Sequence, residues 1–474
     1  MKLENIILPG KDPKSRWNIT LDTGTITSIN PSETASSEPA SLLLPPLCHP
    51  HIHLDKAYIL TCNIQHNPRF SSSTTTDDGG SGKRLPDYTD LAPESGSFSE
   101  ALTKTSEAKR RYTSEDLYLR GAQLLGTSLT QGVTSCRAFV ELDHVTQTLC
   151  LEAAISLQAA FGGKVNVQIC AFAQDPIFST DHGEENRRIL EAALDYYDGQ
   201  QKHIGALGTT PYVESSRDAS IQNIKWAIET SLRYSLNLDF HLDYNLSPDQ
   251  PAMVWDVIRL LKEARWTERA STDKTIVLGH CTRLTLFNHA EMSRLARELR
   301  ESKLPIHFVG LPTSDVFMMG RPSSDDETRA IRPRGTLQVT DMIKEGINAC
   351  LSVNNVGNAF TPWGTGDPIS LASVGVGIYQ GGTEDDATRL YECVSTRARK
   401  AIGLTASLSD ESSSDELGLV LKEGQKGDLL LIRNEEWVAC PGHLSLKIPA
   451  RQRVSVRDVV WDPPEVNLRR TVRC

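Results

Sequence analysis

Short apolar runs alternate with longer segments of helical periodicity through the middle of the chain. Segments such as "SIQNIKWAIETSLRYS" and "HAEMSRLARELRESK" repeat apolar residues every three or four positions, which is typical of amphipathic helices. Eight apolar runs read as buried strands: "LLLPPLCHPHIH", "VTSCRAFVEL", "KVNVQICAFA", "HIGALG", "LNLDFHLD", "TIVLGH", "PIHFVGLP" and "NACLSVN". This alternation predicts an α/β fold, a (β/α)8 TIM-type barrel over residues 47–404. A doubly wound sheet is the alternative, but no GxGxxG follows the first strand.

The two ends of the chain have a different pattern. Residues 1–46 contain short strand-like runs separated by turn residues, and residues 405–474 return to strand-like runs such as "GDLLLI" and "ARQRVSVRDVVW". We therefore predict that both ends pair to form one small β-domain beside the barrel. A Ser-, Thr-, Gly- and Asp-rich insertion around residues 68–95 is predicted to be flexible and to be cut first by proteases.

Composition narrows the class of protein. Of the 474 residues, 39% are hydrophobic and 23% charged, which is ordinary for a globular protein with a large core. The net charge is −10 and no basic stripe occurs, so we expect no nucleic-acid partner. No run of about 18 apolar residues predicts a membrane span. Ten scattered cysteines without a CxxC favour a reducing, cytoplasmic setting. A small-molecule substrate is expected, and self-association to a homo-oligomer stays open.

The stretch "HPHIHLDK" at residues 49–56 carries the first chemical signal. In a strand, side chains two residues apart share a face, so His51 and His53 point the same way and could bind one metal ion. The alternative is a polar strand end whose histidines bond to backbone or water. Catalytic residues of such barrels lie where strands end. His241 and His280 end two further strands, and four histidines at three strand ends favour a metal centre.

Other polar residues fall at strand ends without a settled role. Arg137, in the second strand, could hold an anionic substrate group, or it could form an ion pair inside the barrel. Trp363 follows the eighth strand and could stack on a planar ring or pack against its own loop.

Four motifs together carry a family resemblance: "HIHLDK", "HLDYN", "GHCTRL" and "NNVGNAFTPWGTGDP". In order and spacing the chain resembles the amidohydrolase superfamily of metal-dependent hydrolases, in its cytosine deaminase-like branch, over nearly its whole length. The resemblance implies one divalent transition metal, zinc in preference to iron, bound by His51, His53 and His241. It also implies that His280 lies beside the reacting water and that Gln174 reads a substrate amide. The implied reaction is deamination, or hydrolysis of a cyclic amide or amidine, by metal-activated water attacking an sp² carbon.

Two positions depart from the family pattern. Asn354 stands where the family has a metal-binding Asp after the eighth strand, and Tyr244 stands where the deaminases have a proton-shuttling Glu. An amide cannot take up a proton as a carboxylate does. Asp55, Asp243, Tyr244 and His280 remain as proton carriers, and Asn354 becomes a candidate substrate-binding residue. Two alternatives to hydrolysis therefore stay open: a cyclase, isomerase or lyase that uses the metal as a Lewis acid, and a catalytically silent protein.

Overall fold

A computed structural model describes residues 1–32, 36–61, 85–198, 202–321, 335–404, 418–440 and 442–473. Its central feature is an eight-stranded parallel sheet whose strands follow one another in chain order from β5 to β12. The first and last strands meet where Ile52 bridges Asn354, and the His53 amide donates to the Asn354 carbonyl at 2.9 Å. The sheet therefore closes into the expected (β/α)8 barrel. Its strands are β5 (Leu47–His53), β6 (Val133–Glu141), β7 (Asn166–Ala173), β8 (Ile204–Thr209), β9 (Asn237–Leu242), β10 (Ile276–His280), β11 (Ile306–Gly310) and β12 (Ala349–Leu351).

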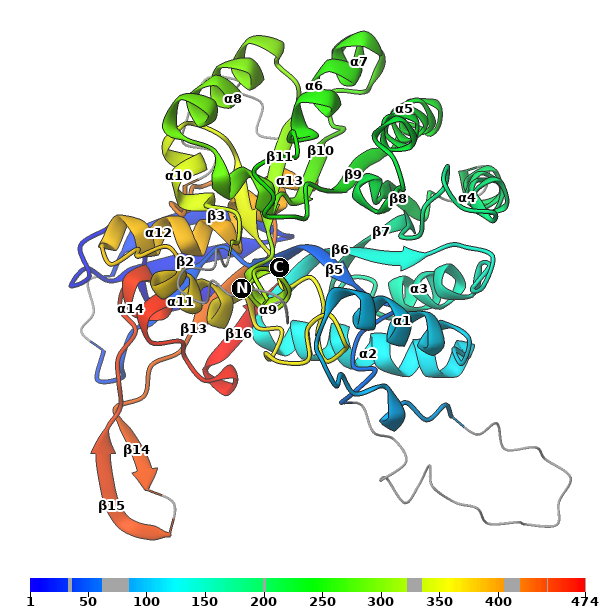
Figure 1. Ribbon diagram of the computed structural model, residues 1–474. Helices are drawn as coiled ribbons and strands as arrows, with labels where there is room; N and C mark the ends of the chain where they lie inside the picture. The colour runs from blue at the N-terminus through cyan, green and yellow to red at the C-terminus, as the bar shows by residue number, and fades with distance from the viewer. Residues whose placement is uncertain are drawn as a thin grey trace, which may run out of the picture.

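Helices surround the barrel on its outer side (Figure 1). The helices that pack on the barrel bury an apolar face against strands that are themselves buried throughout, as β5 and β6 show. No helix among the described residues is long and apolar enough to cross a membrane. In chain order the helices of the described residues are α1 (Phe98–Lys109), α2 (Ser114–Gln131), α3 (Leu149–Ala160), α4 (Gly183–Asp198), α5 (Arg217–Tyr234), α6 (Val254–Glu263), α7 (Trp266–Arg269), α8 (His289–Ser302), α9 (Pro312–Met318), α10 (Val339–Lys344), α11 (Pro368–Ile378), α12 (Glu384–Cys393), α13 (Thr396–Ala401) and α14 (Val456–Trp461). Of these, α9 lies at the barrel mouth and α14 packs on α11 and α12.

A second, six-stranded sheet contains strands from both chain ends, which confirms the predicted small β-domain. Pro45 and Pro46 separate its strand β4 from barrel strand β5; because proline cannot donate to a ladder, the pair marks the passage between sheets. The sheet has its own apolar core around Ile19, Leu43 and Leu431. Its strand order is β16 (Arg469–Val472), β13 (Leu429–Ile432), β4 (Ser41–Leu44), β1 (Lys2–Ile7), β2 (Trp17–Asp22) and β3 (Thr25–Pro31).

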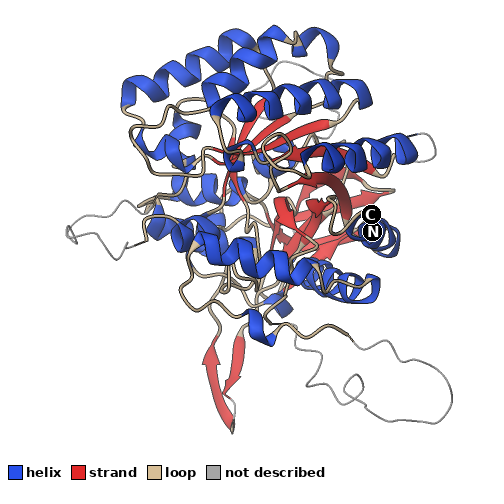
Figure 2. Cartoon of the chain, turned by 45° about the vertical axis from the view of Figure 1, so that its right-hand side comes forward, coloured by secondary structure: helices blue, strands red, loops and turns tan. Residues whose placement is uncertain are grey.

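Two parts of the C-terminal region were not foreseen. Strands β14 (Trp437–Cys440) and β15 (His443–Pro449) form a separate hairpin that projects from the body (Figure 2). The segment 456–461, read as a strand from the sequence, is helix α14. Ser455 caps this helix by accepting from the Asp458 amide, and its buried valines recur at helical spacing. The Ser-x-x-Asp signal therefore outweighs the strand propensity of valine.

The predicted flexible insertion falls only partly within the described residues. Residues 68–84 lie outside them. Residues 85–95 include a short 3-10 turn, Thr89–Leu91, whose Leu91 is buried in the main core. The hydroxyl of Tyr88 donates to the buried Asp116 carboxylate at 2.8 Å. This part of the stretch therefore packs against helix α2.

Candidate metal centre and active site

Three imidazoles converge inside the mouth of the barrel. The alternation of β5 places His51 and His53 on its inner face, and β9 contributes His241 from across the barrel. The Nε2 atom of His241 lies 3.0 Å from Nε2 of His51 and 3.2 Å from Nε2 of His53. A Cβ at Gly279 would lie 3.0 Å from the His51 ring, so glycine at this position leaves room for that imidazole. The ligand atoms of His51, His53 and His241 all lie within 4.8 Å of one another, so this triad could hold one metal ion.

The electrostatic setting keeps these rings neutral. Burial, followed by the nearby His280 and Arg137, lowers the pKa of His51 well below its ordinary value. Burial also lowers the pKa of His53 and of His241, with neighbouring positive groups adding to the effect. Neutral imidazole is the form that ligates metals. Three neutral nitrogen donors close to one point fit a divalent transition metal.

Asn354 lies beside the histidine triad in the wall of the same cavity. Its Nδ2 donates to Ser314 Oγ at 2.9 Å, and Ser314 Oγ lies 2.6 Å from Thr361 Oγ1. Its Oδ1 is buried without a hydrogen-bond partner among the described residues. A buried acceptor of this kind is costly unless something satisfies it. The orphaned oxygen beside the histidines therefore also fits a bound cation or a substrate donor.

A buried carboxylate lies behind the triad. Asp239, two residues before His241, has Oδ1 at 3.9 Å from Nδ1 of His51. Its other oxygen accepts from Arg137 at 2.8 Å, and Arg137 also donates to Gln168 at 2.7 Å. Burial raises the pKa of Asp239 to about 7, although Arg137 opposes the rise. Arg137 is fully buried and lies outside the cavity lining, so it forms the ion pair inside the barrel that the sequence left as an alternative, not the anchor for a substrate anion.

His280, at the end of β10, is held by a second buried carboxylate. Its Nδ1 lies 2.9 Å from Oδ1 of Asp315, in helix α9. Asp315 Oδ2 accepts from Thr336 Oγ1 at 2.7 Å, which fixes the carboxylate. Because Nδ1 of His280 is hydrogen-bonded to Asp315, Nε2 is the ring nitrogen that remains available to exchange a proton with a molecule in the cavity. The backbone at His280 is left-handed, with φ of 65°, as it is at Asn354, with φ of 61°. Such strained turns concentrate at functional sites.

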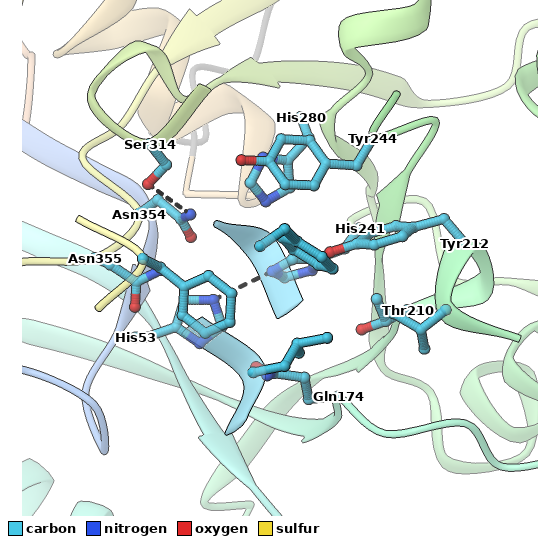
Figure 3. A pocket seen from close by; sticks show the side chains of 14 residues that line it. His53, Gln174, Thr210, Tyr212, His241, Tyr244, His280, Ser314, Asn354 and Asn355 are labelled. Carbon is cyan, nitrogen blue, oxygen red and sulfur yellow. Dashed lines mark hydrogen bonds between the residues drawn. The ribbon is translucent and has the colours of Figure 1, made fainter. Parts of the chain in front are cut away.

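A cavity opens beside the triad (Figure 3). His53, His241 and His280 form its floor, and Tyr244 packs on His280 with ring centroids 4.1 Å apart. Gln174 and Asn354 contribute amide groups to the wall. Neither a carboxylate nor a lysine or arginine is found among the described lining residues. The cavity also touches Phe98, Leu102, Thr210, Tyr212, Val213, Ser314, Asn355 and Phe360.

Two residues proposed from the sequence lie outside this cavity. The Asp243 carboxylate accepts from the backbone amides of Met253 at 2.7 Å and Val254 at 3.1 Å, so it caps the start of helix α6. Burial raises the pKa of Asp243 to about 6. Trp363 is 43% exposed, and its ring nitrogen donates to the Thr313 carbonyl at 3.2 Å. This geometry does not favour a proton-transfer role for Asp243, nor a stacking role for Trp363.

A buried ion cluster adjoins the site behind His53. Lys56 pairs with Glu141, and Lys109, at the end of α1, pairs with Glu141 at 2.7 Å. Lys109 also pairs with Asp143, and with Asp175 at 3.0 Å. Both lysines are almost fully buried. Because Phe98 and Leu102 of α1 line the cavity, Lys109 fixes the helix that forms one cavity wall.

Comparisons with known proteins agree with the fold and the resemblance. No protein-family model matches the chain. N-isopropylammelide isopropyl amidohydrolase of Pseudomonas sp. (strain ADP) is 19% identical over 424 residues, which span 89% of this chain and 87% of that protein. The structure of 5-methylcytosine deaminase from Klebsiella pneumoniae with 5-fluorocytosine superposes with a TM-score of 0.71 at 21% identity, covering 100% of this chain and 96% of that one.

A second solved structure, N-isopropylammelide isopropylaminohydrolase from Burkholderia multivorans, gives a TM-score of 0.66 at 17% identity and the same coverage of both chains. By name, the three proteins are an amidohydrolase, a deaminase and an aminohydrolase. The resemblance to this superfamily and the TIM-barrel fold are therefore confirmed. At 17–21% identity these likenesses show the fold, and the chemistry of this chain rests on its own site.

Proposed function

We propose that this protein is a metal-dependent hydrolase that cleaves a C–N bond of a small, planar, nitrogen-containing molecule. The convergence of three buried, neutral imidazoles on one point beside a cavity supports the proposal most directly. Proteins of similar fold are named as deaminases or aminohydrolases of cytosine and ammelide derivatives, which are planar nitrogen heterocycles. We further propose one divalent metal per chain, with zinc as the first choice.

The residues around the triad have distinct parts in this scheme. When bound, the metal supplies Lewis acidity and a water of lowered pKa. His280 takes up and returns a proton at Nε2, because Asp315 engages Nδ1 and holds the ring in place. Gln174 offers both a donor and an acceptor, which suits a substrate amide edge. Asn354 orients the substrate or completes the metal's surroundings through its unpartnered Oδ1.

Tyr244 serves only as a proton donor in this scheme. Burial, followed by the Asp315 charge, raises its pKa well above the ordinary value of 10.0. The hydroxyl therefore stays protonated near neutral pH and can donate to a leaving nitrogen or a developing negative charge.

Non-hydrolytic chemistry is the second candidate, and one observation favours it. No carboxylate lines the described part of the cavity, because Asn354 and Tyr244 occupy the places where the family pattern has acids. General base catalysis contributes about 10²–10⁴-fold. A site with His280 as its single base is better suited to polarising a substrate than to deprotonating water. A cyclisation, isomerisation or elimination on the same metal is the resulting alternative.

Isotope labelling separates the two candidates. Metal-loaded protein is incubated with planar amides, amidines and N-alkylated heterocycles in H2¹⁸O, while ammonia and amine release are followed. Hydrolysis predicts amine release together with ¹⁸O in the product, and weak or absent deamination of cytosine itself. Turnover without ¹⁸O incorporation would establish the non-hydrolytic alternative, and no turnover on the panel would favour a silent protein.

Replacement of Tyr244 by Phe is expected to lower kcat by roughly 10²-fold, since it removes a single positioned donor. Metal content and folding should not change, because the ring stays packed on His280. Tyr212→Phe is the matched control, since it removes a tyrosine hydroxyl from the same cavity and keeps the aromatic ring. Steady-state kinetics of the two variants decide the matter: equal activity of Tyr244→Phe and wild type would remove the proton role.

A further inference from the structure

The cavity beside the triad is too small for an extended substrate. Its volume is about 30 Å³. A buried water requires about 10–15 Å³ on this measure, so the space equals roughly two water molecules. This inner cavity admits the reacting edge of a planar group and leaves no room for a sizeable substituent.

A second, larger cavity adjoins the first. Its volume is about 710 Å³, which lies in the range of small-molecule binding sites. It lies between the segment after β8, with Ser215 and Arg217, and the segment after β9, with Gln250 and Met253. This outer cavity is on the substrate side of the site, since it borders Tyr244.

Three aromatic rings line both cavities: Phe98, Tyr212 and Tyr244. The centroids of Tyr212 and Tyr244 lie 5.6 Å apart, those of Phe98 and Tyr244 5.9 Å, and those of Phe98 and Tyr212 6.3 Å. The rings are inclined to one another at 53–69° and pack together, so they form an aromatic collar that both cavities share as a wall. A flat molecule that lies against this collar meets aromatic edges and faces, the contacts that aromatic rings prefer.

The charged groups of the outer cavity are already paired within the protein. Glu214 accepts from Asn223 at 2.9 Å and from the Ile177 amide at 2.9 Å. Arg217 pairs with Asp256 at 2.5 Å, and Asp243 caps helix α6. An ionic ligand group would have to compete with these partners. The outer cavity is therefore suited to a neutral group.

Resting on the proposed function, we infer that the substrate has two joined parts, which lie against the aromatic collar in the two cavities. A planar C–N head reacts in the inner cavity, and a neutral substituent larger than a methyl group lies in the outer cavity. The substituent is carried either by the departing nitrogen or by the retained ring. An unsubstituted heterocycle would leave the outer cavity empty and would forgo that contact.

The test uses metal-loaded, full-length protein and four probes: cytosine, N4-propylcytosine, 1-propylcytosine and a 1-(3-carboxypropyl) analogue. Calorimetry measures Kd for each, and kcat/KM is measured wherever turnover occurs. At least one propyl probe is expected to bind about tenfold or more tightly than cytosine, since each buried methylene contributes about fourfold. The N4 and N1 probes separate the departing from the retained substituent. The carboxylate analogue is expected to bind less tightly than 1-propylcytosine.

Ser215→Trp fills the outer cavity from an exposed position, and it should lower the propyl-to-cytosine affinity ratio by roughly tenfold. Ser156→Trp, an exposed serine on α3 outside both cavities, should leave the ratio unchanged. Propyl preference without turnover would contradict the proposed function and keep this inference. Cytosine binding as tightly as both propyl probes, an unchanged ratio in Ser215→Trp, or no binding of any probe would overturn the inference.

Discussion

His241→Ala is expected to lower turnover by at least about 10³-fold, because loss of a metal ligand removes a contribution of several kcal/mol to catalysis. Asn354→Ala should be tolerated better, with a loss of about tenfold, since it removes one neutral hydrogen-bonding group. His241 is expected to matter more than Asn354 because its Nε2 lies within 3.2 Å of the Nε2 atoms of both other histidines, at the centre of the triad. Turnover of the native substrate and metal content are measured for both variants.

His203→Ala is the matched control for this comparison. His203 precedes β8, at the opposite end of the barrel from the cavity, and its Nδ1 lies 2.9 Å from the Gln158 side chain. Its replacement should keep both metal and turnover. An inactive Asn354→Ala beside an active His241→Ala would show that Asn354 is itself essential, and would remove the triad from the mechanism.

Lys109→Met is expected to lower the free energy of unfolding by about 3–5 kcal/mol, the usual cost of removing one partner of a buried ion pair. Lys109 is 5% exposed and is the shared partner of Glu141, Asp143 and Asp175. Without the ammonium group, three carboxylates would lie close together with much of their charge uncompensated. Denaturant unfolding followed by circular dichroism measures the change.

Lys104→Met on the same helix provides the control. Lys104 is only partly buried, and its Nζ donates to the backbone carbonyl of Asp90 at 3.0 Å. Its loss should change stability by about 1 kcal/mol or less. If the two methionine variants are equally stable, the ion cluster does not hold α1 against the barrel.

The sequence predicted the barrel well, because β-strand and helix periodicities alternate cleanly and each strand stays buried. It also located the histidines of the site, since side chains at the ends of parallel barrel strands face one common mouth. His51, His53, His241 and His280 were found in this way and are brought together in the structure. The alternation of residues along each strand and the position of each strand's end are therefore enough to locate these histidines.

The supporting carboxylates were missed. Asp239 lies two residues before His241 in β9, so strand alternation alone places it on the same inner face and could have revealed it. Asp315 could not be assigned from the sequence, because its contact with His280 depends on how α9 returns to the barrel mouth. Arg137 could not be assigned from sequence, since only the packed barrel shows that Asp239 lies opposite it.

The size and shape of the two cavities could not be predicted from the sequence either. The collar combines Phe98 from α1, Tyr212 after β8 and Tyr244 after β9, which lie far apart along the chain. Their proximity depends on the long-range packing of three elements. The placement of Asp243 shows the same limit: its position beside Tyr244 suggested a proton carrier, whereas its carboxylate is occupied by the start of α6.

Metal analysis of the purified protein, after reconstitution with zinc, is the sharpest test of a metal centre at the histidine triad. We expect close to one equivalent per chain, the usual stoichiometry of a catalytic site with three protein ligands and an open position. We also expect that His51→Ala, His53→Ala and His241→Ala each lose the metal. Well under about half an equivalent in the reconstituted wild-type protein, or full retention in all three variants, would contradict a metal centre at this triad.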